Sequence, residues 1–135
     1  LVDMDQSEIL PGVLPVLEFL KANQQPIALG SASKNARPIL EKTGIIAYFD
    51  AIVDGNDVSN AKPDPEVFLQ AAQKLGISYE NAIVFEDSVA GIQAANSASM
   101  ISIGIGDAAV LNEAKFNFKD FTDMDEAFLR SLINN

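Results

Sequence analysis

The fold of this chain is decided by the stretch Ile83-Val84-Phe85-Glu86-Asp87-Ser88. Its apolar part, which begins at Ala82, is short and uninterrupted, as expected for a strand that is buried on both faces. Two acidic residues follow at once, and Ser88 is a favourable N-cap for a helix that runs to Ala98. The stretch therefore predicts a buried strand, a pair of carboxylates at its end, and then a helix.

Outward from this stretch, short apolar segments alternate with helical segments in both directions. Turn-forming Pro and Gly residues and polar loops separate them. The predicted strands are Ile27–Gly30, Ala51–Val53, Ala82–Phe85, Met100–Ile105 and Phe116–Phe118, and the predicted helices are Pro11–Ala22, Ala36–Thr43, Pro63–Leu75, Ser88–Ala98 and Met124–Ile133. Strands that alternate with helices are joined by βαβ crossovers, which makes the strands parallel. We therefore predict an α/β fold, with a Rossmann-like parallel sheet and helices on both faces.

The composition limits the chemistry that this chain can perform. Neither cysteine nor histidine occurs among its 135 residues, which excludes thiol and imidazole catalysis. A metal site would be rich in oxygen ligands, which favours magnesium or calcium. The net charge of −10 disfavours nucleic acids and anionic membranes as partners. No segment is long and apolar enough to span a membrane and no signal-peptide pattern opens the chain, so we expect a cytoplasmic protein.

The candidate functional residues lie where three of the predicted strands end. Ligands of a parallel α/β sheet bind beyond the carboxyl ends of its strands. Ser31 follows the first predicted strand, Lys62 lies in the loop after the second, and Glu86 and Asp87 follow the third. We therefore expect these side chains to gather around one space of the size of a phosphoryl group.

The serine and the lysine each have a functional and a structural interpretation. The hydroxyls and free backbone N–H groups of the Ser31–Asn35 loop suit a phosphate oxygen, although such loops more often only cap a helix. Lys62 precedes Pro63, which keeps its backbone extended, and Pro65 starts the next helix. A lysine held in this way can neutralise phosphate charge, whereas the alternative is an ordinary solvated lysine.

The acidic pair also has two interpretations. Glu86 and Asp87 suit magnesium, because adjacent carboxylates repel one another unless a cation lies between them and the substrate. Alternatively, Asp87 caps the next helix and Glu86 is a surface charge. Gly91 lowers the helix propensity and indicates close packing at that position. Taken together, a hydroxyl, a lysine and an acidic pair predict an anion binder, a neutralising cation and metal ligands in one cleft.

Ser31, Lys62 and the pair Glu86-Asp87 resemble, in this order, the second, third and fourth motifs of the haloacid dehalogenase-like superfamily. The stretches that resemble it, and its β-phosphoglucomutase branch in particular, are Ala28–Asn35, Lys62–Phe68 and Glu86–Ala94. The resemblance covers nearly all of the chain from Pro11 to Gly106, and it is more specific for the superfamily than for this branch. It implies phosphoryl transfer on a small phosphorylated sugar through an aspartyl-phosphate, with Mg²⁺ as the cofactor.

The resemblance also implies a role for each matching residue. Ser31 and Lys62 are the expected catalytic residues, because they would hold the transferring phosphoryl group. Glu86 and Asp87 are the expected ligands of magnesium. The loop residues beyond Ser31 would contact the distal phosphate or a sugar hydroxyl. The full set expected to bind the substrate is Ser31, Ala32 (through its backbone N–H), Ser33, Asn35 and Lys62.

The chain departs from the family pattern at its N-terminal end. The first motif of the family is Asp-x-Asp at the end of an apolar strand, and Asp3-Met4-Asp5 matches it formally. Only two residues precede this match, Gln6 occupies the position of a family glycine, and a few residues stand where the family inserts its cap. We therefore expect residues 1–10 to be the end of a cap domain and its linker, residues 11–135 to be a partial core, and the central N-terminal strand to be missing. An upstream segment or a second chain would then supply the missing strand and the nucleophile.

Three functions are compatible with these observations. The first is the conversion of β-glucose 1-phosphate to glucose 6-phosphate, with hydrolysis of a sugar phosphate as its alternative; without a nucleophile, the chain alone would be inactive. The second is a non-catalytic domain that binds phosphate and magnesium. The third, a receiver-like signalling domain, is disfavoured because its acidic pair belongs after the first strand, whereas Glu86 and Asp87 follow the third predicted strand.

Overall fold

The computed structural model of the chain describes residues 2–3, 12–30, 41 and 46–133. The strands are β1 (Val2–Asp3), β2 (Ala28–Gly30), β3 (Ala51–Val53), β4 (Ile83–Glu86), β5 (Ile101–Ile105) and β6 (Phe116–Phe118). The α-helices are α1 (Val13–Ala22), α3 (Glu66–Leu75), α4 (Val89–Ser97) and α5 (Glu126–Ile133), with short 3-10 helices at Ile46–Tyr48, Tyr79–Asn81 and Phe121–Asp123. The predicted helix Ala36–Thr43 lies outside the described residues except for Glu41, which is helical.

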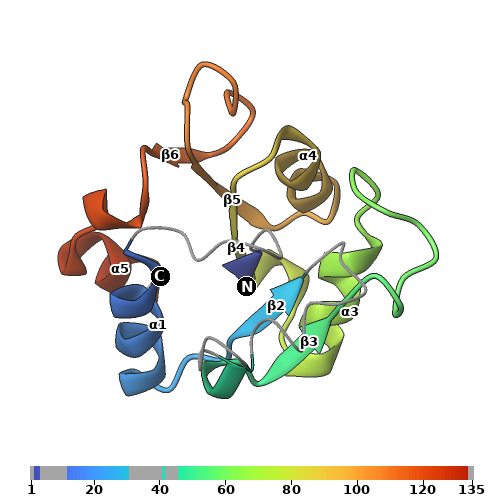
Figure 1. Cartoon of the computed structure of the whole chain (residues 1–135), viewed down its shortest axis with the longest axis horizontal. Coiled ribbons are helices and arrows are strands. Elements are labelled where there is room, and N and C mark those ends of the chain that lie inside the picture. Colours follow the sequence, from blue (N-terminus) through green and yellow to red (C-terminus); the bar gives the residue numbers. More distant parts are fainter. Residues whose placement is uncertain (1, 4–11, 31–40, 42–45, 134–135) are drawn as a thin grey trace.

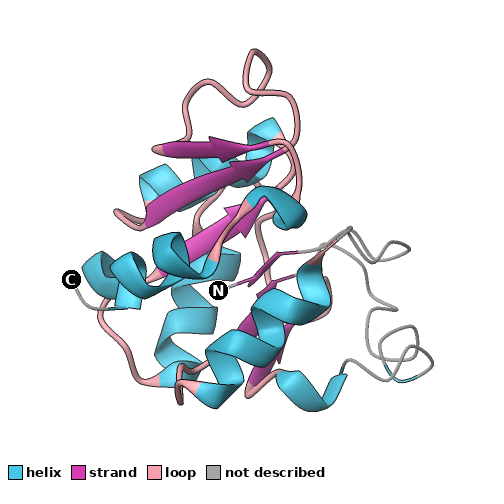
Figure 2. Cartoon of the chain, turned by 90° about the vertical axis from the view of Figure 1, so that its left-hand side faces the viewer, coloured by secondary structure: helices cyan, strands magenta, loops and turns pink. Residues whose placement is uncertain are grey.

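The six strands form one sheet in the order β3-β2-β1-β4-β5-β6, and every neighbouring pair is parallel. Helices α1 and α5 lie on one side of this sheet and α3 and α4 on the other (Figures 1 and 2). The predicted α/β fold, with a parallel sheet and helices on both faces, is therefore confirmed.

Alternation along the strands separates two apolar cores, one on each face of the sheet. Leu29 and Phe85 point to the core formed with α1 and α5, whereas their neighbours Ala28 and Val84 point to the core formed with α3 and α4. The strands are thus buried on both faces, which explains why they read as continuous apolar runs in the sequence.

The expectation that the central strand is missing is wrong. Residues Val2–Asp3 form β1 between β2 and β4, with Val2 paired with Leu29 and Phe85 and Asp3 paired with Gly30. The physical reason is that β2 and β4 would otherwise face each other across a gap with unpaired backbone groups, and two residues of extended chain occupy it. Val2–Asp3 therefore belongs to the parallel sheet of the core. The rest of residues 1–10 lies outside the described residues.

The loop before α3 also differs from the prediction. The helix begins at Glu66 and not at Pro63, because the chain first makes a turn in which the Asp64 N–H donates to the Ala61 carbonyl at 3.0 Å. The Asp64 carboxylate then accepts the Glu66 N–H at 3.0 Å at the start of the helix. Lys62 therefore lies in a structured loop immediately before α3.

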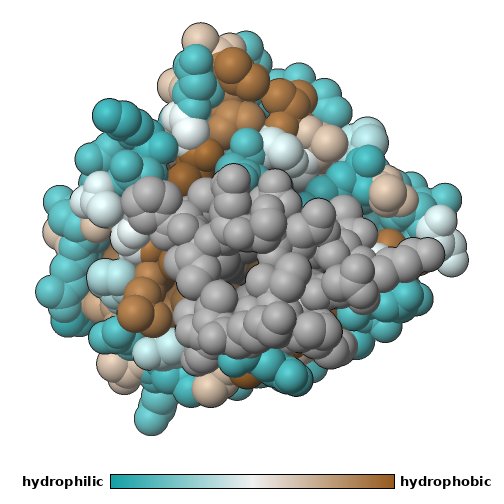
Figure 3. Space-filling view, viewed as in Figure 1, coloured by the Kyte–Doolittle hydropathy of each residue, from teal (hydrophilic) through white to brown (hydrophobic). Residues whose placement is uncertain are grey.

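Few large apolar side chains are exposed among the described residues. The large apolar residues that are exposed are Leu14, Val89 and Val110, and hydrophilic side chains make up much of the rim of the face drawn in Figure 3. None of the helices within the described ranges combines the length and apolar character that crossing a bilayer requires.

Two leucines of α1 test where the core lies. Leu17 has no exposed surface, whereas Leu14 on the same helix is 40% exposed. We expect Leu17→Ala to lower the free energy of unfolding by about 3 kcal/mol, because it leaves a cavity, and Leu14→Ala to lower it by less than about 1 kcal/mol. Urea denaturation followed by circular dichroism measures both. Equal losses for the two variants would contradict this placement of α1.

Candidate active site at the carboxyl edge of the sheet

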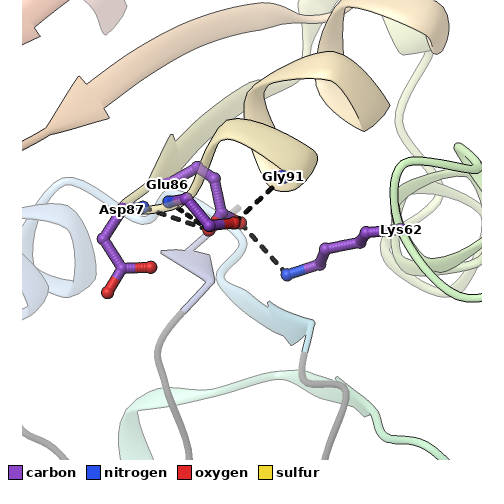
Figure 4. A network of polar contacts seen from close by, with 5 residues as sticks. Lys62, Glu86, Asp87 and Gly91 are labelled. Carbon is purple, nitrogen blue, oxygen red and sulfur yellow. Dashed lines mark hydrogen bonds and ion pairs between the residues drawn. The ribbon is translucent and has the colours of Figure 1, made fainter. Parts of the chain in front are cut away.

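A buried carboxylate lies at the end of β4. Glu86 is the last residue of this strand and is 1% exposed. One oxygen, Oε1, accepts hydrogen bonds from the backbone N–H of Asp87 at 3.1 Å, the N–H of Ser88 at 3.0 Å and the Ser88 hydroxyl at 2.9 Å. The other, Oε2, lies 3.1 Å from the Lys62 ammonium. Glu86 is therefore not a surface charge but the centre of a polar network (Figure 4).

Lys62 reaches this network from the loop before α3. Its side chain is only 14% exposed, and its Nζ atom lies 5.2 Å from the centre of the Phe68 ring. The aromatic face and the Glu86 carboxylate both favour a cation at this point. Lys62 is therefore not an ordinary solvated lysine, and the predicted approach of Lys62 to the acidic pair, across 24 residues of sequence, is present in the structure.

Burial shifts the ionisation of both partners. Loss of solvation raises the pKa of Glu86 to about 8, although the hydrogen bonds from Ser88 act in the opposite direction. Loss of solvation lowers the pKa of Lys62 to about 8, against the raising influence of the negative charge of Asp87. The contact between ammonium and carboxylate opposes both shifts, because each ion stabilises the charged form of the other. Each group therefore favours the charged form of its partner, against the effect of its own burial.

The N-terminus of α4 is built to hold Glu86. Ser88 is the N-cap, as one prediction had it: its hydroxyl oxygen accepts the Gly91 N–H at 3.0 Å while its hydroxyl donates to Glu86. The alternative in which Asp87 caps the helix is therefore wrong. A Cβ atom on Gly91 would lie 1.9 Å from the Glu86 carboxyl carbon, so the close packing predicted at this glycine is confirmed.

The Asp87 side chain is oriented differently from that of Glu86. It is partly buried, and its carboxylate points away from the contact between Lys62 and Glu86 (Figure 4). Within the described ranges, three or more acidic side chains do not come together in a group that could hold a metal ion. A divalent cation would therefore bind Asp87 before Glu86, since Glu86 already accepts four hydrogen bonds. The other oxygen ligands of the cation would come from other groups at this edge of the sheet.

The end of β2 lies at the same edge of the sheet. Gly30 pairs with Asp3 on one side and with Val53 on the other, and a Cβ atom placed on it would lie 3.3 Å from the Phe68 ring, the same ring that Lys62 overlies. The ends of β1, β2 and β4 and the Lys62 ammonium therefore converge. The remaining predicted site residues, Ser31, Ala32, Ser33 and Asn35, lie outside the described residues.

Sequence reasoning missed the residues that hold the Lys62 loop. Glu66 and Gln70, both on α3, bind backbone groups of residues 57–60. Their only sequence signal is the spacing of four residues, which places two polar side chains on one helix face. Sequence reasoning also missed Asp54, a buried acid immediately after β3 whose carboxylate accepts the Asn56 N–H at 2.9 Å.

Comparison with known proteins identifies the family of this chain. The sequence profile of the haloacid dehalogenase-like hydrolases matches residues 1–99. The chain therefore belongs to the haloacid dehalogenase-like family, as its motifs predicted.

Particular relatives include both mutases and phosphatases. The chain is 38% identical over 117 residues to β-phosphoglucomutase of Bacillus subtilis, covering 87% of this chain and 52% of that protein. It is 39% identical over 114 residues to the phosphorylated carbohydrates phosphatase of Thermotoga maritima, covering 81% of this chain and 52% of the relative. The crystal structure of β-phosphoglucomutase from Clostridium difficile superposes with a TM-score of 0.88 at 37% identity, covering 97% of this chain and 59% of that one. The chain thus spans about half the length of the curated relatives that it matches.

Gly91 tests how strictly the buried carboxylate constrains α4. Helix propensity alone predicts that Gly91→Ala stabilises the protein by about 1 kcal/mol. We expect the opposite, a loss of about 2 kcal/mol or more, because the new methyl group displaces the Glu86 carboxylate from its donors. Thermal unfolding measures the change, and Ser97→Ala, at an exposed position of the same helix, is the control. A Gly91→Ala protein that is more stable than the wild type would contradict the geometry described above.

Proposed function

We propose that this chain provides the phosphoryl-transfer site of an enzyme that acts on a small phosphorylated sugar. The observation on which the proposal rests is the buried contact between Lys62 and Glu86, with Asp87 beside it, at the edge where β1, β2 and β4 end. Phosphoryl transfer requires positioned positive charge and little covalent chemistry from the protein. A lysine held by a buried acid, next to a second acid that points away from their contact, meets that requirement.

Lys62 and the loop after β2 would bind the phosphoryl group. The Lys62 ammonium would neutralise charge on its oxygens, and the approach of a phosphate would hold the proton on Nζ, because an anion favours the charged form of the amine. The Ser31 hydroxyl would donate to a second oxygen. The full set proposed to contact substrate is Ser31, Ala32, Ser33, Asn35 and Lys62.

The acidic pair would hold Mg²⁺. Asp87 is the proposed direct ligand, and Glu86 would act mainly by holding Lys62, with its own oxygens reaching the cation only if that contact loosens. When bound, magnesium would supply the charge neutralisation that two acids and a phosphate need in order to approach one another.

Asp3 is the candidate phosphoryl acceptor among the described residues. It ends β1 and is paired with Gly30, immediately before Ser31. In the proposed step a carboxylate oxygen of Asp3 forms a bond to phosphorus, the bond between phosphorus and the sugar oxygen breaks, and the leaving sugar oxygen takes up a proton from water. The competing possibility is that an aspartate from another segment or chain accepts the group, and the two have different experimental outcomes.

Two reactions are proposed in order. The first is the mutase reaction on β-glucose 1-phosphate, supported by the similarity to the β-phosphoglucomutases of Bacillus subtilis and Clostridium difficile. The second is hydrolysis of a sugar phosphate, supported by the similarity to the Thermotoga maritima phosphatase. Both would use the same phosphoryl-enzyme intermediate and differ in whether a sugar hydroxyl or water accepts the group from it.

The products formed from β-glucose 1-phosphate distinguish these reactions. With magnesium and a bisphosphorylated sugar as primer, we expect glucose 6-phosphate; release of inorganic phosphate in its place would identify a phosphatase. Lys62→Met should lower the rate by at least about 100-fold, because it removes the positioned charge, whereas Lys119→Met, at an exposed lysine, should leave the rate unchanged. A chain that takes up the phosphoryl group of acetyl phosphate but forms neither product from several sugar phosphates would contradict the proposal.

Covalent labelling tests the acceptor. We expect acetyl phosphate with magnesium to add one phosphoryl group to the chain, detected by intact mass, and Asp3→Asn to abolish it because the amide is not a nucleophile. Asp5→Asn is the matched control and should still be labelled. Labelling that persists in Asp3→Asn would place the acceptor elsewhere. No labelling of the wild-type chain would mean that the acceptor comes from another segment or chain.

A further inference from the structure

We propose that Glu66, in the first turn of α3, is a positioning residue that holds the Lys62 loop in the geometry needed to bind a phosphoryl group. The inference rests on the function proposed above and extends it to a residue that does not touch the substrate.

The Glu66 carboxylate binds two consecutive backbone N–H groups of the loop. Its Oε2 accepts the Ser59 N–H at 2.8 Å, and its Oε1 accepts the Asn60 N–H at 3.0 Å. The Asn60 side-chain amide adds a longer hydrogen bond to Oε1 at 3.3 Å. Because each oxygen takes a different N–H, the carboxylate fixes the orientation of the backbone at this point as well as its position.

Gln70 extends this contact by one helical turn. Its side-chain amide donates to Glu66 Oε2 at 2.9 Å and to the Asp57 carbonyl at 3.0 Å. Glu66 and Gln70 therefore hold both ends of the segment that runs from Asp57 to Asn60. The helix beneath them is itself fixed, because the neighbouring residues Val67 and Phe68 are buried against the sheet.

Lys62 depends on this contact because it comes two residues after Asn60. Residues 59–61 are exposed, so burial does not hold them, and hydrogen bonds must do so. The hydrogen bonds of the Glu66 carboxylate lie just before Lys62, and the Ala61 carbonyl that accepts the Asp64 N–H lies beside it. The loop conformation then sets where the Lys62 backbone begins, and thereby whether its ammonium can reach Glu86 at 3.1 Å.

The electrostatics of Glu66 agree with this role. The hydrogen bond from the Ser59 N–H, with those from Asn60 and Gln70, holds the pKa of the Glu66 carboxyl below its ordinary value, so the group is ionised at neutral pH. An acid that served only to complement the helix dipole would need the charge but not two hydrogen bonds to the backbone of the preceding loop. A carboxylate that only complements the helix dipole and one that positions the Lys62 loop therefore predict different effects of Glu66 substitutions on Lys62.

The experiment combines ligand binding with a direct probe of Lys62. The variants are Glu66→Ala, Glu66→Gln, Lys62→Ala and the double variant, with Glu80→Gln as a control at an exposed acid outside the loop. The dissociation constant for inorganic phosphate in the presence of magnesium is measured by calorimetry. The Nζ resonance of Lys62 is followed by nuclear magnetic resonance without any ligand, and thermal unfolding reports stability.

We expect Lys62→Ala to weaken phosphate binding by about tenfold or more and Glu66→Ala to weaken it by about threefold to tenfold. Adding Glu66→Ala to Lys62→Ala should cause no further loss, because Glu66 acts through Lys62. Glu66→Gln, which keeps one acceptor oxygen, should fall between the wild type and Glu66→Ala. The Lys62 resonance should shift in both Glu66 variants and remain in place in Glu80→Gln.

The outcomes separate this inference from the function on which it rests. If Lys62→Ala weakens phosphate binding but Glu66→Ala changes neither the binding nor the Lys62 resonance, the positioning role is overturned and the phosphoryl site stands. If the Lys62 resonance shifts in the Glu66 variants but Lys62→Ala leaves phosphate binding unchanged, the positioning role stands and the proposed function fails. Equal losses of binding from Glu66→Ala in the presence and absence of Lys62 would mean a general structural effect and would also overturn the inference.

Discussion

Burial of the Glu86 carboxylate is the constraint on which the rest of the site depends. Removing a charged or polar group from water costs several kcal/mol unless hydrogen bonds and an opposite charge replace the lost solvation. Here Lys62, the Asp87 and Ser88 backbone amides and the Ser88 hydroxyl replace it. Each of these partners comes from a loop or a helix terminus, so the environment of Glu86 fixes the start of α4 and the end of the loop before α3 together.

The two cores of the sheet differ in the size of their side chains, and this difference affects the edge at which the site lies. The face covered by α1 and α5 is packed with large side chains, whereas the face covered by α3 and α4 is rich in small ones. The buried alanines on that second face are Ala28, Ala71, Ala72, Ala82, Ala94, Ala95 and Ala98. Small side chains let two helices pack closely on the sheet, and this brings the N-termini of α3 and α4 near the ends of β2 and β4. At the start of α4 the Glu86 side chain occupies the space that a side chain at Gly91 would need.

Much of this architecture was predictable because it is encoded locally. Buried parallel strands produce continuous apolar runs such as residues 83–85, and caps such as Ser88 mark helix starts, so the α/β class and most element positions followed from periodicity. Strand β1 could not be predicted in the same way. A strand of two residues, Val2–Asp3, has no periodicity of its own, and it exists only because the edges of β2 and β4 offer it hydrogen-bond partners.

The sequence by itself determined which chemical groups lie near the end of which strand: a lysine in the loop after β3 and two adjacent carboxylates where β4 ends, in an order that identifies the family. Only the tertiary structure decided how those groups are used. It made Glu86 the buried partner of Lys62, left the Asp87 carboxylate pointing away from that contact, and placed Glu66 against the Ser59 and Asn60 amides. The reason is physical. Periodicity and capping act within a few residues, whereas desolvation and ion pairing depend on which distant segments the parallel sheet brings to one edge.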